Sequence, residues 1–354
     1  MPIQMHSNER LRLAIAIPEN RRALWVAMLA QCRDIELITA LIPESRFARD
    51  WKKALNCSGA TSNLDEILSS PDIDAIVLTA GSRANERSAD EAVSAGKHVL
   101  SDFQFFGDLE SFDLRAETAV TNGAALFTWM PWRVDDAFKL SRVMLEDGLF
   151  GPHPHATFWT SAIVKVGANP QSTFTRHMGP ALEIANWLFG PAKAVSADLD
   201  LSGGRKSAII CSHPQATVVH HFSSGSERAS LRIDDAGSEC KIEMPASGWD
   251  SLDSSATLEA KRNGKPLISF TSASKQEKLA SLASQLGEFA RQSLNCSSDC
   301  ANQSASRLAL EVASAAMIAS RDNINVALPL SPAPAADRDS SSKTRGLLPA
   351  TISH

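Results

Sequence analysis

His177 is the side chain of this sequence best suited to moving a proton, because an imidazole titrates near neutral pH. Arg176 precedes it and Glu183 follows it closely. An arginine and a carboxylate beside a histidine suit the binding of a hydroxylated or anionic ligand. We therefore predict a ligand site around these three residues, with His177 as its acid–base group. The alternative is that a single histidine at the junction of a loop and a helix is only structural.

The other histidines and the cysteines do not form a metal-binding pattern. His220 and His221 are adjacent, so in a strand their side chains point to opposite faces. The six cysteines are scattered, and the one close pair, Cys296 and Cys300, has no histidine beside it. We predict no metal site and reduced thiols.

The composition of the chain is that of a globular protein. Its 354 residues are enough for two domains, and 44% of them are hydrophobic. A net charge of -5 leaves no basic surface for nucleic acid. No apolar run approaches the roughly 18 residues needed to cross a bilayer, and the first residues lack the apolar core of a signal peptide. We therefore expect a cytoplasmic protein without nucleic-acid or membrane partners.

Residues 11–132 are predicted to form an α/β domain that follows a disordered N-terminus at 1–10. Apolar runs such as Leu11–Ile17 and Ala75–Ala80 are typical of buried parallel strands. Helical patterns alternate with them, such as Glu86–Ala95 with Gly96 as its C-terminal stop. Strands alternating with helices predict a doubly wound parallel sheet of Rossmann type.

Residues 133–330 are predicted to form an α+β domain, and the Ser/Pro/Ala-rich residues 331–354 a disordered tail. Strand-like segments follow one another between 156 and 271, and turns such as Asn263-Gly264 separate them. One helix at 179–189 interrupts the strands, and two helices close the domain. The first of these starts at the capping box Ser274-Lys-Gln-Glu277. The pattern predicts a mostly antiparallel open sheet with helices on one face.

Several segments, taken in order, resemble sequence motifs of the Gfo/Idh/MocA oxidoreductase family. The family is named after glucose–fructose oxidoreductase, inositol dehydrogenase and rhizopine catabolism. The phrases are Asp74-Ala-Ile-Val-Leu-Thr-Ala80, Glu91-Ala-Val-Ser-Ala-Gly-Lys-His-Val-Leu100, Arg133 with the turn Gly148-Leu-Phe-Gly151, Gly179-Pro180 through Asn186-Trp-Leu-Phe-Gly190, and Val326-Ala-Leu-Pro-Leu330. The resemblance implies an NAD- or NADP-dependent oxidoreductase acting on sugars, inositols or related polyols. It also implies assembly into homo- or hetero-oligomers through the open face of the second-domain sheet.

The positions that match the family's cofactor contacts carry unusual residues. The family's glycines let the backbone approach the pyrophosphate at a helix N-terminus. Here Ile17, Glu19 and Arg22 stand in their places, and Ile42 stands where an acid normally holds the ribose. The full set of matching positions is Ile17, Glu19, Arg22, Ala80 and Asp102.

The family's catalytic positions are also altered. Phe103 stands where the resemblance places the catalytic lysine, and the histidine expected after Pro180 is replaced by Ala181. Lys165 and His177 are the candidate substitutes, and the resemblance adds Arg133 to Arg176 and Glu183 as a substrate-binding residue.

Three readings follow from these changes. The first is a family member without standard hydride transfer that acts as a ligand-binding, regulatory or partner subunit. The second is an active NAD(P)-dependent oxidoreductase with a rearranged site. The third is a cofactor-independent lyase or isomerase, which needs an acid–base pair that the sequence does not place. We favour the first.

Overall fold

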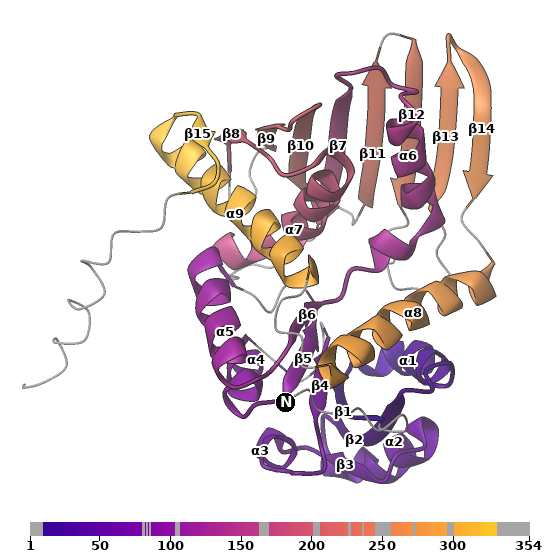
Figure 1. Ribbon diagram of the computed structural model, residues 1–354, viewed down its shortest axis with the longest axis vertical. Helices are drawn as coiled ribbons and strands as arrows, with labels where there is room; N and C mark the ends of the chain where they lie inside the picture. Colours follow the sequence, from indigo (N-terminus) through magenta and orange to yellow (C-terminus); the bar gives the residue numbers. More distant parts are fainter. Residues whose placement is uncertain are drawn as a thin grey trace, which may run out of the picture.

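Two β-sheets lie one above the other along the long axis of the molecule (Figure 1). The computed structural model describes residues 10–79, 82, 84, 86–102, 107–162, 170–200, 206–225, 228–235, 237–244, 256–271, 274–295 and 301–330. Within these ranges, no helix is both long enough and apolar enough to span a membrane. The predicted termini at 1–10 and 331–354 lie outside the described residues, except for Arg10.

The N-terminal sheet has six parallel strands in the order β3-β2-β1-β4-β5-β6. Its strands are β1 (Leu11–Ala16), β2 (Ile35–Leu41), β3 (Gly59–Thr61), β4 (Ala75–Leu78), β5 (His98–Ser101) and β6 (Leu126–Thr128). β4 is fully buried, as expected for an apolar run in the middle of a parallel sheet. This strand order confirms the predicted Rossmann-type domain.

Helices cover both faces of the six-stranded sheet. One face, carrying Leu13 and Ile15, packs against α1 (Arg22–Leu29) and α2 (Ala48–Leu55). The other face packs against α3 (Leu64–Leu68), α4 (Glu86–Ser94) and α5 (Leu109–Thr121).

A third helix, α8 (Lys275–Leu294), completes the first of these faces, although it comes near the end of the chain. Leu286 and Phe289 are buried there, and Phe289 meets Phe127 edge to face at 5.3 Å. The sequence pattern had grouped this helix with the C-terminal sheet. The structure instead places its apolar face on the N-terminal sheet, because apolar residues of β1 and β6 would otherwise be exposed to water.

Gln285 of α8 also holds the segment that connects the two sheets. Its Oε1 accepts a hydrogen bond from Met130 N at 3.1 Å, and its Nε2 donates to Met130 O at 2.5 Å. Both backbone groups of Met130 are therefore satisfied by one side chain.

The C-terminal sheet has nine strands in the order β14-β13-β12-β11-β7-β10-β9-β8-β15. Only the β7–β10 pair is parallel. The strands are β7 (His155–Ala162), β8 (Ala194–Asp198), β9 (Ser207–Ser212), β10 (Thr217–Ser224), β11 (Arg228–Asp235), β12 (Ser238–Met244), β13 (Thr257–Arg262), β14 (Lys265–Thr271) and β15 (Val326–Ala327). The predicted mostly antiparallel sheet is confirmed.

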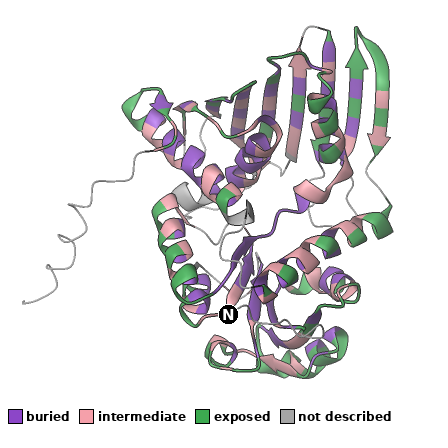
Figure 2. Cartoon of the chain, in the orientation of Figure 1, coloured by how far each residue is buried: buried purple, intermediate pink, exposed green. Residues whose placement is uncertain are grey.

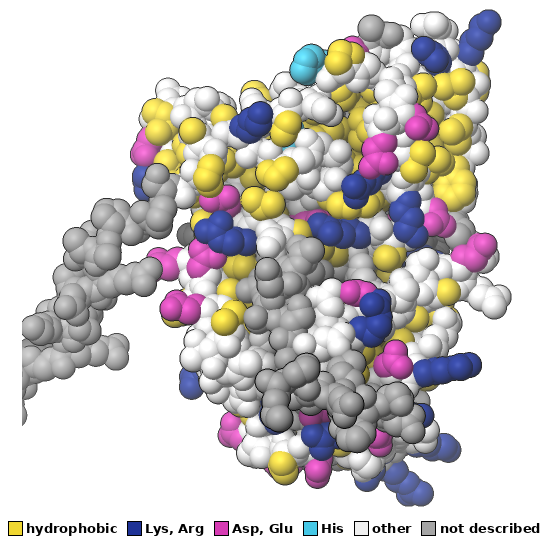
Figure 3. Space-filling model, in the orientation of Figure 1, with side chains coloured by type: hydrophobic (Ala, Val, Ile, Leu, Met, Phe, Trp, Pro, Cys, Tyr) yellow, Lys and Arg dark blue, Asp and Glu magenta, His cyan; other side chains and the backbone are white. Residues whose placement is uncertain are grey.

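Helices α6 (Asp136–Glu146), α7 (Pro170–Phe189) and α9 (Ala301–Asp322) lie on one face of this sheet (Figure 1). Buried and exposed residues alternate along its strands (Figure 2), as expected when one face is covered and the other is open. On the side of the molecule seen in Figure 3, hydrophobic side chains gather over the half that holds this sheet.

Candidate functional site

The carboxyl ends of β1 and β4 mark the point where the strand order of the parallel sheet reverses. Ligands of doubly wound sheets bind in the crevice outside such a switch point. The turn after β1 begins with Ile17, which is only 2% exposed, and Pro18, which has extended backbone angles (φ -76°, ψ 155°). A short 3₁₀ helix (Glu19–Arg21) then leads into α1. The turn is therefore built from a buried branched side chain and a residue without an N–H group.

An ion pair joins this turn to the end of a different strand. Arg21 donates from Nη1 to Oδ2 of Asp102 at 3.3 Å. Asp102 directly follows β5, and its backbone N–H donates to Leu78 O at the end of β4. Because β4 lies between β1 and β5, the ion pair crosses the carboxyl edge of the sheet next to the switch point. The two side chains are 27% and 15% exposed, so water screens the pair only in part.

The other two charges of the turn satisfy each other. Arg22 Nη2 lies 2.9 Å from Glu19 Oε1, and the Arg22 guanidinium lies over the ring of Trp51 at 5.3 Å from its centroid. At the end of β2, Ile42 is fully buried and offers no acid for a ribose. Glu44, two residues later, is in an ion pair with Arg46. Both glutamates are thus engaged in ion pairs with neighbouring arginines.

The residues at the turn after β1 and at the end of β2 bear on whether a dinucleotide fits the crevice. Conventional binding needs N–H groups and close backbone approach at the first turn, together with an acid at the end of the second strand. Pro18 lacks an N–H, Ile17 adds a buried side chain, and Ile42 replaces the acid. Three positions that bear on this question, Ala80, Phe103 and Lys165, lie outside the described residues.

Arg133 and Glu183 form a buried ionic contact between the connecting segment and α7. Glu183 has no exposed surface, and its Oε1 accepts a hydrogen bond from Arg133 Nε at 2.7 Å. Arg133 Nη2 and Trp132 Nε1 also donate to this carboxylate. Glu183 is a predicted substrate-binding residue, but its carboxylate is inaccessible in this conformation. Its hydrogen bonds from Arg133 and Trp132 are internal to the protein. It anchors the short helix η4 (Pro131–Val134) to α7.

His177 lies well inside α7, and this corrects the predicted start of the helix at 179. The helix begins at Pro170, so Gly179 and Pro180, which are helix-breaking signals in a sequence, occur within it. The His177 ring stacks on Phe222 of β10 at 6.2 Å, while the preceding Arg176 is exposed. Burial, with a smaller effect of Arg176, lowers the pKa of His177 to about 4. At neutral pH its imidazole is therefore uncharged.

The predicted residues are brought together only in part. Arg133 and Glu183 are in contact, and Arg176 and His177 are neighbours on α7. The ion pair between Arg21 and Asp102 joins two positions that the sequence separates by 81 residues, and only Asp102 of the two was among the candidate site residues. Within the described ranges, no three histidine, cysteine or acidic side chains gather as a metal site would require.

The fold of the chain is similar to that of known oxidoreductases. The family model of the Gfo/Idh/MocA oxidoreductases with an NAD-binding Rossmann fold matches residues 20–127. No curated protein matches the chain. Three solved structures illustrate its similarity over most of both chains.

The first is an aldose–aldose oxidoreductase from Caulobacter crescentus complexed with glycerol. It has 17% identity and a TM-score of 0.70, and the match covers 90% of this chain and 100% of that one. The second is KijD10, a 3-ketoreductase from Actinomadura kijaniata in complex with NADP, with 14% identity, a TM-score of 0.69 and coverage of 88% and 98%. The third is an oxidoreductase from Agrobacterium radiobacter in complex with NAD+, L-tartaric acid and magnesium, with 11% identity, a TM-score of 0.67 and coverage of 90% and 98%.

At these identities the solved structures establish the fold, while the family model matches residues within the N-terminal domain. Both agree with the resemblance that the sequence phrases predicted. Residues 20–127 thus match the model of the oxidoreductase family with an NAD-binding Rossmann fold, and the chain has the two-domain fold of the similar oxidoreductase structures.

Proposed function

We propose that this chain is a member of the oxidoreductase family that has lost standard hydride transfer, and that it acts as a ligand-binding, regulatory or partner subunit in the cytoplasm. The observation that carries the proposal is the ion pair between Arg21 and Asp102 across the carboxyl edge of the sheet. It lies where a dinucleotide would approach the turn after β1. Displacing it would expose two charges that now neutralise each other.

The composition of the turn supports the same conclusion. A pyrophosphate carries two negative charges, and Glu19 places another negative charge in the turn. Arg21 and Arg22, the two cations nearby, already have carboxylate partners in Asp102 and Glu19. Conventional binding of NAD or NADP would therefore cost two ion pairs before it gained any phosphate contact.

The ligand of the proposed protein is a small hydroxylated or anionic molecule, such as a sugar or polyol derivative. Arg176 is exposed on α7 beside His177, whose uncharged imidazole can exchange hydrogen bonds with a hydroxyl group. By family resemblance we also propose that the chain assembles as a homo- or hetero-oligomer through its nine-stranded sheet.

The second candidate is an active NAD(P)-dependent oxidoreductase with a rearranged site. It is favoured by the retained fold and by the NAD+ and NADP bound in two of the similar solved structures. Under this alternative, Lys165 or His177 moves the proton of the reacting hydroxyl. Substitution of either residue by alanine then abolishes turnover, whereas under the first proposal there is no turnover to lose.

The deciding experiment is titration of the full chain with NADH and NADPH, followed by quenching of its seven tryptophans and by nicotinamide fluorescence. We expect no saturation up to millimolar cofactor. The matched variants are Asp102→Asn, which removes the carboxylate that pairs with Arg21, and Asp50→Asn, which removes an exposed charge of the same type on α2. Micromolar binding by the wild type would overturn the proposal and justify a screen of polyol and sugar substrates.

A further inference from the structure

We propose an internal water-binding site between the end of α7 and the strands β9 and β10, on the helix-covered side of the nine-stranded sheet. Three polar side chains form it, Asn186, His213 and His220, and none of these residues is more than 8% exposed. The site is separate from the crevice of the N-terminal sheet and from the open face proposed for assembly. It does not rest on the function proposed above.

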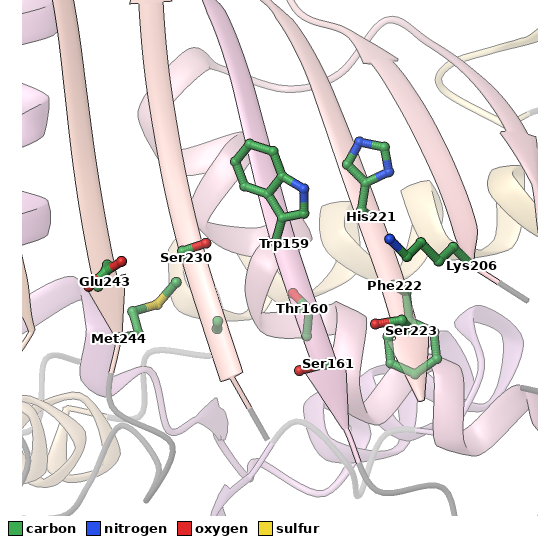
Figure 4. A pocket seen from close by; sticks show the side chains of 11 residues that line it. Trp159, Thr160, Ser161, Lys206, His221, Phe222, Ser223, Ser230, Glu243 and Met244 are labelled. Carbon is green, nitrogen blue, oxygen red and sulfur yellow. The ribbon is translucent and has the colours of Figure 1, made fainter. Parts of the chain in front are cut away.

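His220 of β10 forms the deepest part of the site. Figure 4 looks onto the open face of the sheet, where the side chain of His221 stands beside Trp159 with the helices behind the strands. Because successive side chains of a strand point to opposite faces, His220 is directed to the covered side, and it has no exposed surface. Its ring stacks on Phe158 at 4.9 Å with 11° between the planes. Stacking engages a face of the ring, while both nitrogens at the ring edge have no protein partner.

His213 lies in the turn between β9 and β10. Its backbone N–H donates to Ala216 O at 2.8 Å, and its ring lies edge-on to Phe189, the last residue of α7, at 6.0 Å. The Nδ1 atom is 2.6 Å from Gly190 O. A carbonyl oxygen only accepts hydrogen bonds, so Nδ1 carries the proton and Nε2 is left as an acceptor. This Nε2 is buried and has no protein partner.

Asn186 holds the same loop from the helix. Its Oδ1 accepts a hydrogen bond from Ala192 N at 3.2 Å, two residues after the Gly190 carbonyl that His213 binds. The Nδ2 group of Asn186 is therefore a buried donor without a protein partner. One short loop thus brings Asn186 and His213 to the end of α7, and His213 is near enough to His220 for their charges to interact.

The unpaired atoms of these three side chains include both donors and acceptors. Asn186 Nδ2 donates, His213 Nε2 accepts, and the neutral ring of His220 offers one donor and one acceptor. Burial lowers the pKa of both histidines, so both rings are uncharged at neutral pH. A water molecule donates and accepts hydrogen bonds, so it can bridge groups of both kinds, as buried waters do in other proteins. Without such a bridge, each group would keep the cost of its desolvation.

The chemistry of the lining favours water over an ion. A buried anion or cation needs a compensating charge, and two neutral imidazoles and an amide supply none. In the part of the chain that the structure describes, no three histidine, cysteine or acidic side chains gather as a metal would require. We therefore assign at least one ordered water that links His213 or Asn186, beside the end of α7, to His220 of β10.

The test is a crystal structure of the full chain at neutral pH, at a resolution that shows ordered water. We expect a solvent peak within hydrogen-bond distance, about 2.7–3.2 Å, of a His220 nitrogen and of His213 Nε2 or Asn186 Nδ2. The absence of a solvent peak there would overturn the assignment. A direct hydrogen bond between the two imidazoles would overturn it as well.

A second measurement tests the site in solution. Oxygen-17 magnetic relaxation dispersion counts the water molecules that stay bound for long times, and His220→Phe should lower this count by at least one. His153→Phe makes the same exchange at an exposed position and should leave the count unchanged. Equal counts in the wild type and both variants would contradict a water bound to His220. None of these outcomes bears on NADH binding, so the two proposals fail independently.

Discussion

Arg133 and Glu183 meet across the boundary between the two sheets, with Arg133 Nε 2.7 Å from a carboxylate that has no exposed surface. Removing one partner of a buried pair leaves the other charge uncompensated. We expect Glu183→Gln to lower the free energy of unfolding by about 3 kcal/mol. Urea denaturation followed by tryptophan fluorescence measures the change.

The control for this prediction is Glu146→Gln, which breaks the exposed ion pair with Arg142 on α6. Exposed pairs of this kind contribute less than about 1 kcal/mol. Equal losses of stability in the two variants would show that Glu183 is not an essential anchor of η4 on α7.

His220 makes the stability of the fold depend on pH. Its ring is fully buried against Phe158, and both ring nitrogens lack a hydrogen-bond partner. Burial, with smaller effects of His213 and His221, lowers the pKa of His220 to about 3. The unfolded chain binds a proton near pH 6.5 and the folded chain does not, so stability falls as pH drops below that value. We expect a loss of about 2 kcal/mol between pH 7 and pH 5 from this group.

Replacement of His220 by phenylalanine removes this proton-linked loss and should flatten the dependence of the unfolding free energy on pH. His153→Asn, at an exposed position, should leave the slope unchanged. If His220→Phe shows the wild-type slope between pH 5 and 7, other groups carry the acid sensitivity.

Gln285 is expected to stabilise the connection between the sheets. Gln285→Ala removes the Gln285 bonds to the N–H and C=O groups of Met130, of which the C=O keeps its bond from Arg133 N, at a cost of about 1–3 kcal/mol. Ser284→Ala on the same helix removes only an exposed bond to Ser281 O and serves as the control. Thermal unfolding by circular dichroism compares the two, and a loss of equal size in both variants would contradict the role assigned to Gln285.

Cys211 and Cys240 are expected to resist thiol reagents in the folded chain. Both are fully buried, and burial raises the pKa of each thiol to about 12. Since the thiolate is the reactive form, alkylation at pH 8 should be negligible until the protein unfolds. Peptide mass spectrometry after iodoacetamide treatment, with and without urea, measures the protection. Labelling of Cys211 in the native state would reveal local opening of β9.

The sequence predicted local elements well where the signals were local. The expected strands Leu11–Ile17 and Ala75–Ala80 and the expected helix Glu86–Ala95 agree with β1, β4 and α4 to within two residues. β3 (Gly59–Thr61) was missed, because three residues of intermediate burial give no hydrophobic pattern. The capping box predicted the start of α8, but no local signal indicates which of the two sheets the helix covers.

The candidate site was less predictable because its contacts are not local. The altered glycine positions were visible in the sequence, and the structure shows the buried Ile17 that they imply. The bond between Arg21 and Asp102 depends on strand order, which no single segment reveals.

The position of α8 has a consequence for how the chain folds during synthesis on the ribosome. The six-stranded sheet is synthesised first, but the helix that covers one of its faces emerges only after most of the nine-stranded sheet. During that interval Phe127 and its apolar neighbours have no cover, which is a state that favours aggregation. We therefore expect the nascent N-terminal half to depend on chaperones until residue 294 has left the exit tunnel, so that the two halves reach the native state together rather than in sequence.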